Sequence, residues 1–135
     1  MPGSTLGRVL GTAHELESRL EAALGEKGLS LAKLGVLQTL GEARGPLPLG
    51  ELAEANQCVR SNITQLVDRL EADGLVRRMN DPGDRRIRRA VLTAKGRKLW
   101  AAGLRILEAH ERKVAKALGA GELAALERTL ARLRE

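Results

Sequence analysis

The stretch that most constrains the fold runs from Leu49 to Leu92, where two helical segments are followed by a basic hairpin. Residues 49–55 carry apolar side chains at helical spacing, and a second helix is predicted from about Val59 to Asp73. The turn Asn56-Gln57-Cys58 separates them. Two helices joined by so short a turn are typical of the helix-turn-helix, which places its second helix in the major groove of DNA.

The second of these helices has one apolar and one polar side. Its apolar residues Ile63, Leu66, Val67 and Leu70 recur at the spacing of a single helical face. The remaining surface carries side chains of the types that hydrogen-bond base edges and phosphates. We therefore predict a recognition helix with these candidate DNA-binding residues: Arg60, Ser61, Asn62, Thr64, Gln65 and Arg69.

A basic hairpin is predicted directly after this helix. Gly74 suits the left-handed position that ends a helix, and two short strands, 75–79 and 87–92, flank a turn that contains Pro82 and Gly83. Between residues 77 and 89 there are six arginines against two aspartates, a local excess of +4 in a chain of net charge +6. That concentration favours a phosphate-binding patch over an ordinary solvated surface.

Four more helices and one extended segment are predicted around this centre. The helices span about 6–24, 31–40, 93–118 and 122–134, and residues 45–49 are expected to be extended because Pro46 and Pro48 disfavour a helix. Ser30 and Thr93 are the expected N-caps of the helices that follow them.

Apolar stripes at both ends of the chain suggest that the first and last helices form an interface. Leucines at 123, 126, 130 and 133 follow heptad spacing, and the first helix carries a similar stripe. Packing within one chain is the alternative, but the small central domain offers no nearby partner for either stripe. We therefore favour a homodimer, with residues 1–29 and 94–135 as dimerisation helices around a DNA-binding domain of residues 30–93.

Composition excludes several other classes of protein. Trp100 is the only aromatic residue, so single-strand binding by aromatic stacking is disfavoured. One cysteine among 135 residues cannot form an internal disulfide. The chain has neither a long apolar run nor a signal-peptide layout at its start, so we expect a cytoplasmic protein with no membrane partner. A sequence pI near 10.2 favours a polyanionic partner.

Two spaced motifs in this chain resemble the MarR family of bacterial winged-helix transcription regulators. The first is Asp84-Arg85-Arg86 followed after five residues by Leu92-Thr93-Ala94-Lys95-Gly96, which is similar to the wing-and-helix signature of that family. The second combines Arg60-Ser61, Thr64 and residues 66–71 with Gly74-Leu75-Val76. The resemblance covers about residues 29–96, and the flanking helices agree in type.

The resemblance implies a mainly α fold with a small β-wing, a winged helix-turn-helix that binds double-stranded DNA as a homodimer. The wing arginine of the family corresponds to Arg86, which would reach into a minor groove while Asp84 orients it. Arg85, Arg88 and Arg89 would mostly hold phosphates. Dimer symmetry implies a pseudo-palindromic operator with half-sites ~34 Å apart. Proteins of this kind are most often repressors, and the resemblance implies release by a small-molecule effector of unknown identity. That effector would bind the crevice between the winged helix and the dimerisation helices.

The chain departs from the family pattern at the turn before the recognition helix. Such proteins usually carry an apolar residue, a glycine and a valine where this chain has Asn56, Gln57 and Cys58. Gln57 is then expected to adopt the conformation that a glycine would take more easily. Val59 replaces the usual capping residue, so the helix is expected to start poorly capped or to begin at Ser61.

Several other residues are better explained by packing than by chemistry. Cys58 could sense oxidants beside the recognition helix, but a small apolar filler is the favoured interpretation. His14 and His110 lack the spacing of a metal site, and Trp100 fits a core position. We expect no cofactor and no metal, and the sequence contains no nucleophile-base constellation or phosphate-binding glycine loop, so the chain is predicted not to be an enzyme. Nonspecific architectural DNA binding, or a helical protein-interaction module, is the alternative function.

Overall fold

The computed structural model describes residues 3–57 and 60–135, with residues 60 and 61 described by their backbone alone. The elements, in chain order, are α1 (Thr5–Gly25), α2 (Leu31–Glu42), β1 (Leu47–Pro48), α3 (Leu49–Ala55), α4 (Arg60–Ala72), β2 (Val76–Asn80), β3 (Arg88–Leu92), α5 (Ala94–Ala117) and α6 (Ala120–Leu133). This order confirms the predicted fold class, a mainly helical chain with a small β-wing.

The sheet has three antiparallel strands in the order β1-β3-β2. The hairpin pairs Val76 with Leu92 at its base and Asn80 with Arg88 near its tip. The segment expected to be extended pairs as well, because Leu47 lies opposite Ala90. The wing is therefore a three-stranded sheet and not only a hairpin, and Pro48 is tolerated since β1 is an edge strand.

One core lies between α2, α3, α4 and the sheet. From α4 it receives Ile63, Val67 and Leu70, each with no exposed surface, so the predicted apolar face of that helix is the buried one. The inward positions predicted for α3 are also buried: Leu49, Leu52 and Ala53. Burying this face turns the polar side of α4 outward.

The start of α5 is fixed against the end of α4. The Thr93 hydroxyl donates to the Gly74 carbonyl at 2.7 Å and accepts from the Gly96 N–H at 3.0 Å, which makes Thr93 the predicted N-cap. A Cβ on Gly96 would lie 2.0 Å from the Leu75 carbonyl oxygen, so only glycine allows this approach. The winged domain therefore joins α5 through a close backbone contact.

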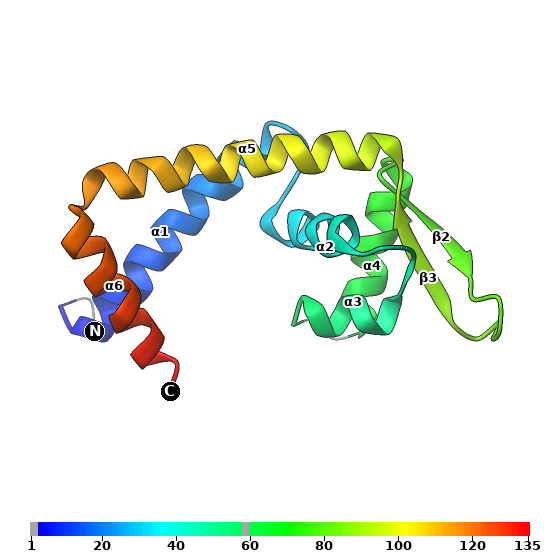
Figure 1. The fold of residues 1–135 in the computed structure, drawn as a ribbon, viewed down its shortest axis with the longest axis horizontal. Helices are drawn as coiled ribbons and strands as arrows, with labels where there is room; N and C mark the ends of the chain where they lie inside the picture. Colours follow the sequence, from blue (N-terminus) through cyan, green and yellow to red (C-terminus); the bar gives the residue numbers. More distant parts are fainter. Residues whose placement is uncertain (1–2, 58–59) are drawn as a thin grey trace.

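Figure 1 shows α5 running along one side of the molecule. The winged domain with β2 and β3 lies at its N-terminal end, whereas α1, α6 and both chain termini lie at the other end. No residue of α6, all of which the structure describes, is buried. Large apolar side chains are exposed on these two helices, namely Leu6, Val9, Leu10 and Leu16 of α1 and Leu126, Leu130 and Leu133 of α6.

Trp100 packs against the core from α5, as predicted. Its ring lies against the backbone of Gly41, where a Cβ would meet the ring at 2.4 Å, and its Nε1 donates to Gln38 Oε1 at 2.6 Å. The indole therefore joins α5 to α2. Among the helices that the structure describes, none is long and apolar enough to cross a membrane.

Candidate nucleic-acid interface

The outward side of α4 carries most of the residues predicted to read DNA. Asn62, Gln65 and Arg69 are exposed there, and Thr64 is half-buried. Arg60 and Ser61 lie in the first turn of the same helix, but their side chains are outside the described part of the chain. The structure thus brings the exposed predicted side chains together on one surface of one helix.

The turn before α4 has the conformation expected from its unusual sequence. Gln57 has φ +53°, in the left-handed region where glycine is the favoured residue. Its neighbour Asn56 is held by its side-chain amide, which donates to the Leu52 carbonyl at 2.9 Å and to the Thr39 hydroxyl at 3.3 Å. The predictions about Cys58 and Val59 fall outside the described residues.

The wing tip presents Arg86 to solvent. Its side chain is 91% exposed, and its Nε and a terminal nitrogen donate to the two oxygens of Asp84, each at 3.1 Å. The Arg86 backbone N–H donates to the same carboxylate at 2.9 Å. These bonds from Arg86 hold the pKa of Asp84 below its usual range. Asp84 therefore orients an otherwise free cation, with the geometry that the sequence predicts.

A second carboxylate shapes the turn of the wing. Asp81 accepts the backbone N–H groups of Gly83 at 2.9 Å and Asp84 at 3.0 Å. Its other oxygen accepts from Arg89 Nε at 2.5 Å, and this bond is the main reason that the pKa of Asp81 is lowered. Asp81 thus ties the tip to the strand that follows it.

Arg89 differs from the other predicted phosphate ligands of the wing. Besides its ion pair with Asp81, it donates to the Pro46 carbonyl at 3.2 Å, and so links the wing to the segment before β1. Arg85 and Arg88, by contrast, are exposed. The guanidinium of Arg89 is occupied because Asp81 lies within its reach across the hairpin, a pairing that the run of arginines does not reveal.

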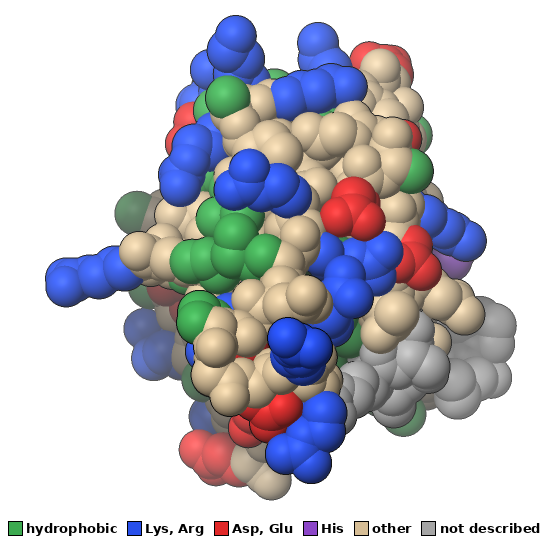
Figure 2. Space-filling view, turned by 90° about the vertical axis from the view of Figure 1, so that its right-hand side faces the viewer, with side chains coloured by type: hydrophobic (Ala, Val, Ile, Leu, Met, Phe, Trp, Pro, Cys, Tyr) green, Lys and Arg blue, Asp and Glu red, His purple; other side chains and the backbone are tan. Residues whose placement is uncertain are grey.

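Lys and Arg side chains are spread over the end of the molecule formed by the wing, with acidic side chains between them (Figure 2). Besides Arg89, a second basic residue of this end has partners that sequence spacing does not indicate. Arg78, on β2, lies 2.6 Å from Asp68 and 3.0 Å from Glu71, both on α4. Sequence spacing does not distinguish Arg78 from the other arginines of the hairpin. Its partners lie on α4, which is separated from β2 by the turn at Gly74.

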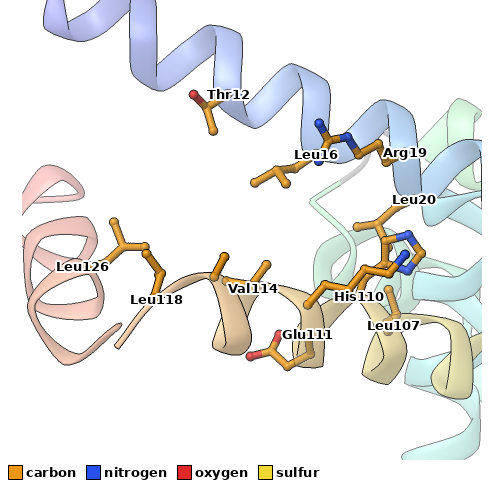
Figure 3. A pocket seen from close by; sticks show the side chains of 12 residues that line it. Thr12, Leu16, Arg19, Leu20, Leu107, His110, Glu111, Val114, Leu118 and Leu126 are labelled. Carbon is orange, nitrogen blue, oxygen red and sulfur yellow. The ribbon is translucent and has the colours of Figure 1, made fainter. Parts of the chain in front are cut away.

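A cavity of about 700 Å³ opens between α1, α5 and α6 (Figure 3). Its walls are mostly apolar, with Leu16 and Leu20 of α1 facing Leu107 and Val114 of α5. The cavity is also lined by polar side chains, which are Thr12, Arg19, His110, Glu111 and Lys113. This cavity lies among the flanking helices. A smaller cavity of about 310 Å³ lies between α2 and α5, in the crevice between the winged domain and the flanking helices where the sequence predicts an effector. The described residues contain no cluster of three potential metal ligands.

Known proteins share this architecture. The sequence model of a protein family, described as the MarR family, matches residues 29–87. A probable transcriptional regulator from Pseudomonas aeruginosa is 30% identical, with a TM-score of 0.84 over 98% of this chain and 99% of that one. A mutant MarR from E. coli, complexed with operator DNA, is 25% identical, with a TM-score of 0.82 over 95% of this chain and 92% of that one.

Curated relatives match over a shorter stretch. The transcriptional activatory protein BadR from Rhodopseudomonas palustris is 36% identical over 87 residues, which are 64% of this chain and 49% of that protein. The chain spans about half the length of the first curated relatives that it matches.

A helix-turn-helix with an exposed polar recognition helix and a basic wing defines the winged-helix class of DNA-binding regulators. The chain belongs to the MarR family of transcriptional regulators. Membership confirms the family resemblance of the two sequence motifs. It also agrees with the prediction that the chain is not an enzyme, because the family consists of transcriptional regulators.

Proposed function

We propose that the chain binds a pseudo-palindromic operator in double-stranded DNA as a homodimer and regulates transcription there. The observation that carries this proposal is the wing tip, where Asp84 orients Arg86, whose side chain is 91% exposed, in the same domain as an outward-facing polar helix. An arginine held in one orientation at the tip of a narrow hairpin suits the narrow minor groove, where negative potential is strongest.

Each element has a separate role in this proposal. The recognition helix α4 enters the major groove, where Gln65 and Asn62 suit contacts to base edges. Arg69, Thr64 and the first-turn residues Arg60 and Ser61 position the helix on the DNA backbone. In the wing, Arg85 and Arg88 contact phosphates, and Arg89 supports the wing through Asp81.

The exposed apolar faces of α1 and α6 support the dimer. Leu6 is 60% exposed and Leu133 is 63% exposed, although both are large apolar side chains on well-formed helices. Large exposed apolar side chains that recur along one helix favour an interaction site. In this proposal, residues 1–29 and 94–135 dimerise, and residues 30–93 bind DNA.

Repression and effector release complete the proposal. A dimer that covers an operator excludes other proteins from the same DNA, so repression needs no further contact. An effector can act only by favouring a dimer whose recognition helices have the wrong spacing for the operator. The cavity between α1, α5 and α6 lies where a ligand could change that spacing, since it borders the helices proposed to dimerise.

In vitro selection from a random DNA library tests the proposal. The expected result is a consensus of two inverted half-sites, with binding to it at least ~10³-fold tighter than binding to competitor DNA. Binding without sequence preference would favour the architectural alternative. A protein that binds no DNA would favour the interaction-module alternative.

A further inference from the structure

A cluster of three charged side chains ties α4 to β2. The Arg78 guanidinium donates to Glu71 Oε1 from Nε at 3.2 Å and from a terminal nitrogen at 3.0 Å. Its other terminal nitrogen lies 2.6 Å from Asp68 Oδ1. A single guanidinium therefore binds two carboxylates three residues apart on α4, and two of its N–H groups converge on one oxygen of Glu71.

The backbone takes part in the same cluster. The Arg78 N–H donates to Glu71 Oε2 at 2.9 Å. Since β2 is an edge strand of the sheet, Glu71 supplies an acceptor on the side where no further strand pairs. Backbone and side-chain hydrogen bonds from Arg78 lower the pKa of Glu71, because they stabilise its charged form.

The charges of α4 explain why such a cluster matters for a helix that approaches DNA. Two arginines on α4, Arg60 and Arg69, are balanced by Asp68 and Glu71, so the helix brings no net positive charge of its own. A carboxylate beside a phosphate is repelled unless a cation offsets it. Arg78 supplies that cation from the neighbouring strand.

Side-chain exposure indicates whether Arg78 binds the two carboxylates of α4 or a DNA phosphate. The Arg78 side chain is 22% exposed, compared with 51% for Asp68 and 37% for Glu71. Arg78 is therefore the most covered of the three side chains. It is thus placed to neutralise the two carboxylates and not to reach past them toward a phosphate.

We propose that Arg78 is a positioning residue for DNA recognition, which fixes the wing to the recognition helix and neutralises Asp68 and Glu71 without contacting DNA. This inference rests on the proposed function, since it concerns the same surface. It predicts that α4 and the wing approach DNA as one rigid unit. It also separates Arg78 from Arg85 and Arg88, which are proposed phosphate contacts.

Salt-dependent DNA binding tests the neutralising role. In anisotropy titrations of the full chain with the selected operator, Arg78→Met should weaken binding by about tenfold, because two carboxylates then face phosphates unpaired. The slope of log K against log salt should stay the same, since no phosphate contact is lost. Adding Asp68→Asn and Glu71→Gln to Arg78→Met should restore the part of the affinity that the two unpaired carboxylates cost. A slope smaller by about one, or no recovery, would overturn the proposal.

Hydrogen exchange of the free protein tests the positioning role without DNA. Both Arg78→Met and Glu71→Gln should accelerate amide exchange across residues 76–80, because each breaks the link between β2 and α4. Arg77→Met is the matched control, since Arg77 is an exposed arginine on the same strand and should leave this exchange unchanged. Unchanged exchange in Glu71→Gln would overturn the link. If both variants exchanged faster but the wild type bound no DNA, the link between β2 and α4 would stand and only the proposed function would be refuted.

Discussion

Asp84 and Arg86 illustrate how one pair of side chains prepares a binding group. Long arginine side chains lose rotamer freedom when they bind, which opposes association. Two side-chain hydrogen bonds from Arg86 to the Asp84 carboxylate already restrict that freedom in the free protein. The same carboxylate leaves most of the guanidinium surface open to solvent, so the arginine is oriented and still available.

Replacement of the wing arginine should separate DNA binding from folding. We expect Arg86→Ala to weaken operator binding by about 10- to 100-fold, the range for loss of one specific arginine contact. Asp84→Asn should weaken it less, because Arg86 stays charged but loses its orientation. Anisotropy titrations measure both effects. Sedimentation should give the same oligomeric state for the wild type, Arg86→Ala and Asp84→Asn. If Arg86→Ala bound the operator as tightly as the wild type, Arg86 would not have its proposed role.

Acid should affect the wing through its two aspartates. The folded pKa of Asp81 and of Asp84 is lowered, so their stabilisation is complete above the ordinary aspartate pKa of about 3.9 and is lost as pH falls below it. NMR titration of the Gly83 and Arg86 amides, which bond these carboxylates, should give midpoints below that ordinary value.

Removal of the arginine partners supplies the control for this titration. Arg86→Ala should raise the midpoint of Asp84, and Arg89→Ala should raise that of Asp81, because these arginines are the largest causes of the two shifts. Midpoints that do not respond to either replacement would contradict this explanation.

At the scale of elements, local patterns predicted most of the fold. The i, i+3, i+4, i+7 spacing of Ile63, Leu66, Val67 and Leu70 correctly indicated the buried side of α4, since helix periodicity depends only on local geometry. Capping by Ser30 was equally local, and its hydroxyl accepts from the Lys33 N–H at 3.1 Å. The ends of α6 and the strands differ from the predicted ends by only a few residues.

Contacts between distant elements could not be predicted in the same way. The pairing of Leu47 with Ala90, the bond from Arg89 to Pro46 and the position of Arg78 between two carboxylates all depend on tertiary geometry. A run of arginines in the sequence indicates how much positive charge is present, but it does not indicate which guanidinium forms an ion pair. The candidate site was therefore located from sequence, and the roles within it required the structure.

The turn between α3 and α4 should gain stability from a glycine. Gln57 has φ +53°, so Gln57→Gly should stabilise the fold by about 1 kcal/mol, the cost of that conformation for a residue with a Cβ. Gly74→Ala, at φ +76°, should destabilise it by about the same amount. Thermal unfolding measures both.

Gly45→Ala is the matched control for these two variants. Its Cβ would have no atom within 4 Å, and its φ lies outside the left-handed region. A change in melting temperature as large as that of Gly74→Ala would show that backbone conformation is not the cause.

At the scale of the whole molecule, the proposed dimer can be broken without touching the DNA-binding surface. Leu126 and Leu130 of α6 are each 41% exposed, so a glutamate at either position would place a charge in the proposed interface. We expect Leu130→Glu to shift the protein to monomers in sedimentation equilibrium and to lose tight operator binding.

The control for the dimer places the same charge elsewhere on α6. Ala124 is exposed on the side opposite the leucine stripe, so Ala124→Glu should remain dimeric. Equal dissociation by both variants would indicate general damage to the helix, and no dissociation by Leu130→Glu would contradict the proposed interface.

The length of α5 makes the winged domain sensitive to small rotations. Its 24 residues span about 36 Å at 1.5 Å per residue. Because the Thr93 and Gly96 contacts fix its first turn to the winged domain, the helix acts as a lever arm with α1 and α6 at its far end. A tilt of about 10° at that end would displace the recognition helix by roughly 6 Å, half the ~12 Å width of the major groove. The range of tilt angles that α1 and α6 allow α5 therefore determines how closely the spacing of the two recognition helices in a dimer can match the spacing of the half-sites in one operator.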